Sequence, residues 1–270
     1  MAAMTCTTGS IVRNRLLAAL PEAERQQLLS RMQRVEFSVG DILFGEGRRP
    51  PYVYFPVTAV VSLLHSDSDG VCTEVAAVGN EGMLGVTTLL GVGESPRRAL
   101  VQNSGWAYRM NGAALREEFM RGGQVQHLLL RYIQALLTMM GQVAVCNRRH
   151  SIEQQMCRWL LLNLDRTDSR ELTMTHERLA SLLGVRREGI TEAARRLQAA
   201  GFIIYRRGHI TVASRDGIEA SACECYGVIR RVYEQLHIRP SCAQARPAAS
   251  GGSGSSPGGG FGHALAPSPA

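Results

Sequence analysis

Lysine is absent from this 270-residue sequence, so all 30 of its Lys and Arg positions are arginine. Arginine carries a planar guanidinium group that can pair with two acceptors of a phosphate or a guanine edge at once, which lysine cannot do. A codon bias toward Arg, Ala and Gly is the simpler cause of the missing lysine. The formal net charge of +7 still favours an anionic partner.

Long uninterrupted apolar runs are also missing, because Arg131 or Arg158 breaks the longest ones. The N-terminus lacks the basic region, apolar run and small-residue cleavage site of a secretory leader. The seven cysteines are odd in number and scattered, without the spacing of a disulfide framework. We therefore expect a cytoplasmic protein that is neither secreted nor inserted in a membrane.

Motifs of several common enzyme classes do not occur. The sequence has no Gly-x-Ser-x-Gly elbow and no phosphate-binding loop that ends in Gly-Lys, and His176-Glu177 lacks the second histidine of a zinc protease helix. These absences argue against an enzyme.

The character of the sequence that is present changes along the chain. Residues 11–34 have apolar positions at helical spacing on both sides of Pro21, which predicts two short helices. Residues 35 to about 110 consist of short Val-, Phe- and Tyr-rich runs separated by turn residues, which predicts an antiparallel β-roll or barrel. The predicted α+β fold has four parts: a β-roll with a helical cap (1–123), a long helix with a hinge (124–150), a C-terminal domain (151–240) and a disordered tail (241–270).

The segment from 124 to 147 predicts one long helix with two apolar stripes. Leu128, Ile133, Leu137 and Met140 form one of them. The other has alternating spacings of four and three, as in the seam of a coiled coil, and comprises Val125, Leu129, Tyr132, Leu136, Met139, Val143 and Cys146. We interpret this second stripe as the seam of a homodimer. A single helix buried within one chain is the alternative. Asn147 to His150 are expected to form a hinge before a helix capped by Ser151.

Residues 175 to 201, THERLASLLGVRREGITEAARRLQAAG, have the pattern of two helices joined by a tight turn. Thr175 is a suitable cap for the first helix, Ala180 is small where a second helix must cross closely, and Gly184 can adopt the positive φ of the turn. Gly201 follows the second helix as a C-terminal glycine. The sequence therefore predicts a helix-turn-helix.

Charged and polar side chains occupy the outer face of the second predicted helix. They are of the types that read base edges, namely Arg186, Arg187, Glu188, Thr191, Glu192 and Arg195. The segment FIIYRRGHITV follows and predicts a β-hairpin wing. Contacts with the DNA backbone are expected from the wing and from the start of the first helix, through Thr175, Arg178, Arg206, Arg207 and His209. A helical hairpin with an ordinary solvated face is the alternative.

This order of β-roll, long helix, hinge and winged helix-turn-helix resembles the Crp/Fnr family of bacterial transcription regulators over roughly residues 11 to 238. The C-terminal segments LGVRREGIT, AGFIIYRRGHITV and ACECY carry the resemblance best. It implies a jelly roll like that of cyclic-nucleotide-binding proteins, and it places Arg187 and Glu188 where family members carry a base-reading Arg-Glu pair. Glu192 departs from the family pattern, in which an arginine is frequent.

The resemblance also directs attention to an effector site in the roll, formed by Gly85, Thr87, Arg97 and Arg98. Family members that bind cyclic nucleotides carry a Gly-Glu pair, where this chain has Gly85-Val86. Valine cannot accept the hydrogen bonds of a ribose hydroxyl, which argues against cyclic AMP, although the two arginines could hold another anion. Solvated arginines are the plain alternative.

The cysteines do not predict a cofactor. The oxygen-sensing branch of the family binds iron and sulfur through an N-terminal cysteine cluster, and only Cys6 is present there, which argues against an iron–sulfur cluster. Cys223-Glu-Cys225 could form a metal or redox site with His209 or Cys157, but buried packing is the simpler interpretation. We expect no metal.

These patterns predict a transcription regulator that binds double-stranded DNA as a homodimer, with RNA polymerase as a further partner if it activates. A ligand-binding regulatory subunit without DNA contact is the rival hypothesis. It requires that the arginines of the helix and wing have no partner.

Overall fold

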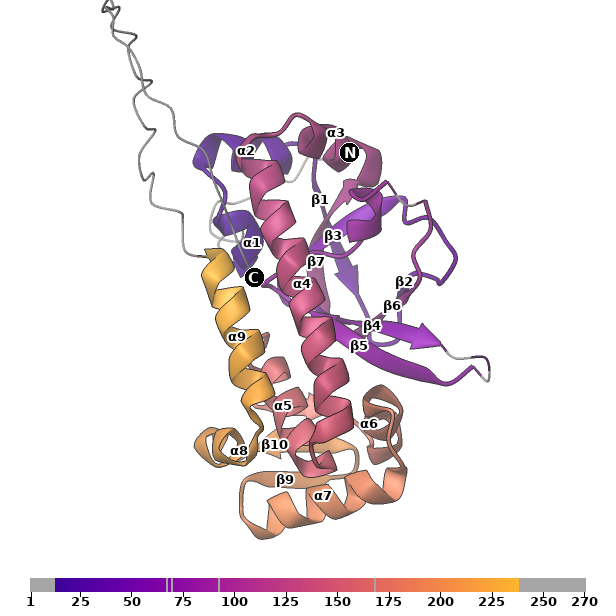
Figure 1. Cartoon of the computed structure of the whole chain (residues 1–270), viewed down its shortest axis with the longest axis vertical. Helices are drawn as coiled ribbons and strands as arrows, with labels where there is room; N and C mark the ends of the chain where they lie inside the picture. The colour runs from indigo at the N-terminus through magenta and orange to yellow at the C-terminus, as the bar shows by residue number, and fades with distance from the viewer. Residues whose placement is uncertain (1–12, 67, 69, 92, 168, 238–270) are drawn as a thin grey trace, which may run out of the picture. The chain divides into compact units, whose positions relative to one another are not determined.

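Short runs rich in β-branched and aromatic residues form two antiparallel sheets in the N-terminal half of the chain (Figure 1). The structure is a computed structural model that describes residues 13–66, 68, 70–91, 93–167 and 169–237, all within the compact unit Met1–Arg239. One sheet has the order β1-β7-β3, with strands Gln33–Phe37, Gly105–Asn111 and Tyr52–Pro56. The other has the order β2-β6-β4-β5, with strands Ile42–Phe44, Arg98–Asn103, Val60–Ser66 and Cys72–Val78.

The helical cap forms as the sequence predicts. Helix α1 (Arg15–Ala18) and helix α2 (Glu22–Leu29) lie on either side of Pro21, which occupies the N-cap position of α2. The buried amide of Asn14 caps α1 and also donates hydrogen bonds to the carbonyl oxygens of Pro56 (2.7 Å) and Gly82 (3.1 Å). This one polar side chain therefore attaches the cap to the roll.

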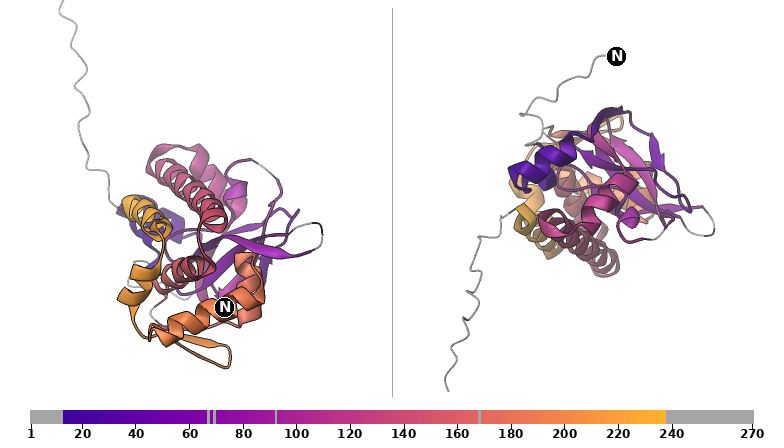
Figure 2. Two further views of the ribbon diagram at one scale, coloured as in Figure 1. Left: turned by 60° about the horizontal axis from the view of Figure 1, so that its bottom comes forward. Right: turned by 90° about the horizontal axis from the view of Figure 1, so that it is seen from above.

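A long helix connects the roll to the C-terminal part. After α3 (Gly112–Met120), α4 runs from Gly123 to Arg149 beside α9 (Glu224–His237), with α9 packed along it (Figures 1 and 2). The predicted hinge is shorter than expected, because Asn147, Arg148 and Arg149 are helical. Only His150 and Ser151, the caps of two successive helices, separate α4 from α5 (Ile152–Leu164).

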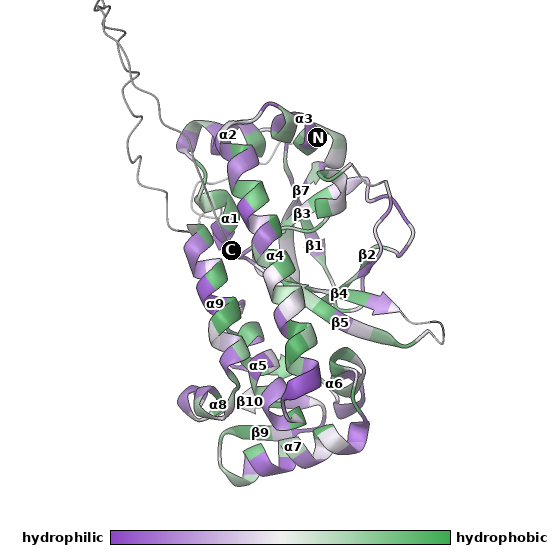
Figure 3. Cartoon of the chain, viewed as in Figure 1, coloured by the Kyte–Doolittle hydropathy of each residue, from purple (hydrophilic) through white to green (hydrophobic). Residues whose placement is uncertain are grey.

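Helix α4 is long and apolar enough, by length and composition, to cross a membrane. The same composition is typical of a core helix, and nine of its side chains are buried within this chain. Figure 3 shows hydrophobic segments on the face of α4 that is turned toward the viewer as well. This helix therefore has an inner and an outer apolar face.

The C-terminal part combines helices with a small sheet. Strand β8 (Glu171–Thr173) precedes helices α6 (His176–Leu183) and α7 (Arg187–Ala199), and strands β9 (Ile203–Arg206) and β10 (His209–Val212) follow. The three strands form one antiparallel sheet in the order β8-β10-β9, and α8 (Arg215–Ser221) leads to α9. The predicted tail, residues 241–270, lies outside the described residues.

Candidate functional site

Helices α6 and α7 meet at the turn that the sequence predicts. The Thr175 hydroxyl accepts a hydrogen bond from the Arg178 backbone N–H (3.2 Å) and so caps α6. Gly184 ends α6 with φ 66°, a left-handed conformation that side chains with a Cβ rarely adopt. Ala180 is 5% exposed at the crossing of the two helices. The pair is therefore a helix-turn-helix with a close crossing.

Helix α7 separates an apolar inner face from a polar outer face. Ile190, Ala193, Ala194 and Leu197 are buried against the rest of the domain. All of the predicted base-reading side chains lie on the other side, where Arg186, Arg187, Glu188, Thr191 and Arg195 are exposed and Glu192 is half-exposed. Arg186 is the residue that precedes the helix, and Arg187 is its first residue. The N-terminal end of α7 thus carries three consecutive exposed charged side chains, Arg186, Arg187 and Glu188.

Glu192 is held by arginines of its own helix. Its carboxylate accepts hydrogen bonds from Nε (3.0 Å) and Nη2 (2.9 Å) of Arg195, and Arg196 lies within 3.4 Å of the same carboxylate. Arg195 lowers the pKa of the Glu192 carboxyl. Because this acid is paired and ionised, its charge on the outer face of α7 is locally compensated.

The wing has a two-residue turn in which both residues have positive φ. Arg207 (φ 48°) and Gly208 (φ 83°) connect β9 to β10, as in the turn type that matches the twist of a β-hairpin. Arg206, Arg207 and His209 are exposed around this turn. His209 lies 3.0 Å from the Glu171 carboxylate of the neighbouring strand, so its ring is held beside the turn. The wing therefore presents three adjacent cationic or titratable groups.

His176 connects the helices to the wing, a role that the sequence did not reveal. Its Nδ1 lies 3.1 Å from the hydroxyl of Thr191 on α7, and its ring stacks on Tyr205 of β9 with a centroid distance of 4.1 Å. Burial lowers the pKa of His176, and the nearby Arg187 charge acts in the same direction. A histidine that directly follows a helix cap has no sequence signature for such a contact, because both partners are distant along the chain.

The predicted effector residues are only partly brought together. Gly85, Thr87 and Arg97 line a common cavity in the roll, next to Ser95 and to Leu136 of α4. Arg98 does not belong to its lining. The cavity volume is about 10 Å³, room for roughly one water molecule. Burial lowers the pKa of Arg97.

The predicted dimer seam faces the interior of the chain, so that assignment was wrong. Its residues are at most 7% exposed within a single copy, and they are Val125, Leu129, Tyr132, Leu136, Met139, Val143 and Cys146. Tyr132, for example, donates a hydrogen bond to the Met83 carbonyl of the roll (2.7 Å), and Gly82 leaves room for its ring. The outward stripe overlaps the other predicted one but differs from it: Leu137 (58% exposed) and the half-buried Ile133 and Met140 belong to it, whereas Leu128 is buried (7% exposed) and the outward Leu130 (48% exposed) was not predicted. Apolar spacing locates both stripes but does not say which one faces inward.

Four potential metal ligands converge where α4 ends. They are Cys146, His150, Cys223 and Cys225, and their ligand atoms all lie within 4.8 Å of one another. Neither partner that the sequence suggested for Cys223 and Cys225 belongs to this group, which contains neither Cys157 nor His209, and His209 pairs with Glu171. A hydrogen bond from Cys223 lowers the pKa of the Cys146 thiol, and the Arg158 guanidinium acts in the same direction. The described residues therefore include a group that could hold a metal ion, so the expectation of no metal is not supported.

Comparisons with known proteins agree with this architecture. Residues 154–221 match the Crp-like helix-turn-helix domain. FixK2 from Bradyrhizobium japonicum is similar in structure, with 17% identity and a TM-score of 0.60 over 71% of this chain and 98% of that one. TTHA1359, a CRP/FNR family regulator from Thermus thermophilus, has 20% identity and a TM-score of 0.57 over 70% and 98% of the two chains. No curated protein matches significantly.

A β-roll fold followed by a Crp-like helix-turn-helix is the architecture of a class of two-part transcription regulators that bind DNA. Residues 154–221 are a Crp-like helix-turn-helix domain, and the chain has the fold of the Crp/Fnr-family regulators to which it is similar in structure. The resemblance and the fold class that the sequence indicated are confirmed.

Proposed function

We propose that the chain is a sequence-specific regulator that binds palindromic DNA as a homodimer in the bacterial cytoplasm. One observation carries the proposal: the exposed N-terminal end of α7 and the exposed wing turn together present arginines from two adjoining elements. The N-terminal residues of such a helix are those that contact base edges in the major groove. The wing arginines suit the phosphates beside it.

Base reading is assigned to the exposed face of α7. Arg187 would pair with guanine O6 and N7, and Glu188 would accept from cytosine N4. Arg186 precedes them at the helix start. The Thr191 hydroxyl donates to the Arg187 carbonyl (3.0 Å), so its methyl group is the part left for a thymine methyl. Glu192 and Arg195 would act as a pair, with Arg195 as the member that meets DNA.

Backbone contacts are assigned to two elements that flank α7. Arg206, Arg207 and His209 would contact phosphates from the wing. Thr175 and Arg178 lie at the start of α6, where backbone N–H groups and the helix dipole also favour a phosphate.

The outward stripe of α4 is the surface that we assign to the second copy. Leu130, Ile133, Leu137, Met140 and Ala144 follow alternating spacings of three and four, and the stripe contains no charged side chain. Two copies that pair along this stripe would place their two recognition helices (α7) on successive major grooves, as a palindrome requires.

The roll is proposed to influence α4, since Leu136 of that helix lines the same cavity as Gly85, Thr87 and Arg97. The Val86 side chain and the small volume of this cavity argue against binding of a cyclic nucleotide. We also propose no iron–sulfur cluster for this chain. If the regulator activates transcription, RNA polymerase is its further partner.

The proposal is tested by selecting binding sites from a random DNA pool with the purified dimer, without added ligand. We expect a palindrome. Arg187→Ala should reduce the free energy of DNA binding by about 1–3 kcal/mol through one base position of each half-site, and it should relax the base preference at that position. Arg207→Ala is the matched control, and it should weaken binding to all sequences alike and reduce the salt dependence.

An unchanged base preference in Arg187→Ala would show that this residue does not read a base. The rival, a regulatory subunit without DNA contact, predicts no retention of any DNA even at low salt. Binding that falls steeply as salt rises would exclude that rival.

A further inference from the structure

The cysteines and histidine at the end of α4 form a closed group that the DNA-binding proposal does not use. Cys146 and His150 are one helical turn apart, and His150 is the C-cap of the helix. Cys223 and Cys225 lie on either side of Glu224 where α8 gives way to α9. We propose that these four side chains bind one zinc ion, which fixes the end of α4 to the start of α9.

The dimensions of the group fit a single tetrahedral ion. With Zn–S bonds of about 2.3 Å and Zn–N bonds of about 2.0 Å, neighbouring ligand atoms are roughly 3.5–3.8 Å apart. The Sγ atoms of Cys146 and Cys223 are 3.5 Å apart, and Cys225 Sγ lies 3.4 Å from His150 Nδ1. Three sulfurs and one imidazole are a recurrent donor set of structural zinc sites.

The histidine is oriented as a metal ligand would be. Its Nδ1 faces the thiols, while its Nε2 lies 3.2 Å from a carboxylate oxygen of Glu224. A carboxylate on the far ring nitrogen fixes the tautomer that leaves the near nitrogen free to bind, an arrangement common at zinc sites. Gln142 is a second side chain that supports the site, because it donates a hydrogen bond to Cys225 Sγ (3.1 Å).

The charge of the site is matched by a buried arginine. Three thiolates and one Zn²⁺ leave a net charge of −1. Arg158, which is 3% exposed, lies against Cys146, and within the described part of the chain its Nε has no hydrogen-bond partner. A buried cation with unused donor capacity is costly unless an anion lies beside it. The zinc–thiolate centre would supply such an anion on the Cys146 side, in addition to the buried Glu74 carboxylate that the Arg158 charge also acts on.

Two other occupants fit less well. A disulfide between Cys146 and Cys223 would leave Cys225 and the Glu224-oriented His150 without a role. An iron–sulfur cluster places several metal and sulfide atoms between its ligands, so it needs a wider separation than a group contained within 4.8 Å provides.

The test uses full-length, tag-free protein purified under reducing conditions. Elemental analysis should give one zinc per chain, and replacement with cobalt should produce the visible spectrum of tetrahedral thiolate coordination. Cys225→Ser and His150→Ala should lose the stoichiometric zinc. Cys72→Ser, a half-buried thiol outside the group, should keep it.

Chelator competition keeps the test valid if a ligand variant fails to fold. Glu224→Gln should retain one zinc but bind it about 10- to 100-fold more weakly. Glu234→Gln on the same helix should bind it as tightly as the parent protein. The proposal is overturned by parent protein that takes up no zinc when reduced and supplied with it, by full zinc in both ligand variants, or by isolation with a Cys146–Cys223 disulfide.

Discussion

His176 occupies the first position of α6, where it contacts both α7 and strand β9 of the wing. Its Nε2 is buried without a hydrogen-bond partner among the described residues. Protonation would place a second positive charge close to Arg187 in this setting. The neutral form is therefore the one that the folded domain favours.

The direction of the resulting pH dependence follows from the lowered pKa. Because the folded state disfavours the charged ring, the contribution of the neutral ring to the free energy of unfolding is complete above pH 6.5, the ordinary pKa of histidine. This contribution is lost as the pH falls from 6.5 toward the lower pKa of His176 in the folded state. The melting temperature between pH 8 and pH 5 should fall more steeply in the parent protein than in His176→Asn. His127→Asn, at an exposed position on α4, is the control, and a His176→Asn slope equal to the parent slope would contradict the assignment.

Two neighbouring leucines lie on opposite faces of helix α4, so substitutions at them test the two faces of this element separately. Leu137 is 58% exposed and Leu136 is 3% exposed. Leu137→Glu should leave the fold intact but dissociate the proposed dimer, because it places two buried carboxylates in the interface at a cost of about 2 kcal/mol or more each. Sedimentation at several concentrations measures this effect.

The adjacent substitution supplies the control. Leu136→Ala should lower the free energy of unfolding by about 2–5 kcal/mol while the dissociation constant of the dimer changes little. A Leu137→Glu variant that remains dimeric would exclude the outward stripe as the interface.

Local chemistry made some elements predictable and left others hidden. Thr175, Gly184 and Gly201 each satisfy a demand of the backbone within a few residues, so the helix-turn-helix could be located from sequence. The faces of α4 could not be distinguished, because both have apolar side chains at helical spacing and only the packing against the roll and α9 decides between them. The group at Cys146 was missed because 77 residues separate that thiol from Cys223.

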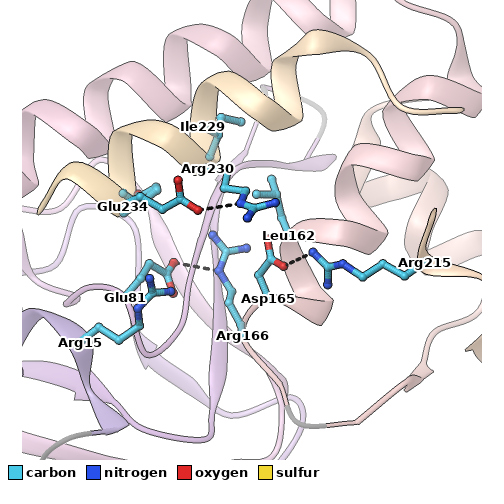
Figure 4. A pocket seen from close by; sticks show the side chains of 10 residues that line it. Arg15, Glu81, Leu162, Asp165, Arg166, Arg215, Ile229, Arg230 and Glu234 are labelled. Carbon is cyan, nitrogen blue, oxygen red and sulfur yellow. Dashed lines mark hydrogen bonds and ion pairs between the residues drawn. The ribbon is translucent and has the colours of Figure 1, made fainter. Parts of the chain in front are cut away.

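At the scale of the whole molecule, a buried ion pair joins the roll to the segment after α5. Arg166 Nε donates to the Glu81 carboxylate (2.8 Å) (Figure 4). Its Nη2 donates to the Ala77 carbonyl (2.9 Å). Both side chains are at most 6% exposed. Gly79 gives this arginine room, since a Cβ there would lie 2.8 Å from its Cγ.

Removing one partner should leave a buried charge without compensation. We expect Glu81→Gln or Arg166→Met to lower the free energy of unfolding by about 3–5 kcal/mol, and the double variant to lose less than the sum. Denaturant titrations of all four proteins measure the coupling. Arg230→Gln, which breaks the exposed pair with Glu234 visible in Figure 4, should lower the free energy of unfolding by at most about 1 kcal/mol. Additive losses at Glu81 and Arg166 would show that the two side chains act separately.

The small size of the cavity at Gly85, Thr87 and Arg97 has a thermodynamic consequence for any molecule that would bind there. Because it holds about 10 Å³, a molecule larger than water binds only a state in which Leu136 and the facing strands have moved apart. The observed Kd then equals the intrinsic Kd divided by the fraction of open molecules. A substitution that loosens this packing would lower the observed Kd without adding a contact to the ligand, because it raises the fraction of open molecules. Ligand binding would in turn increase the fraction of molecules in which the roll is open.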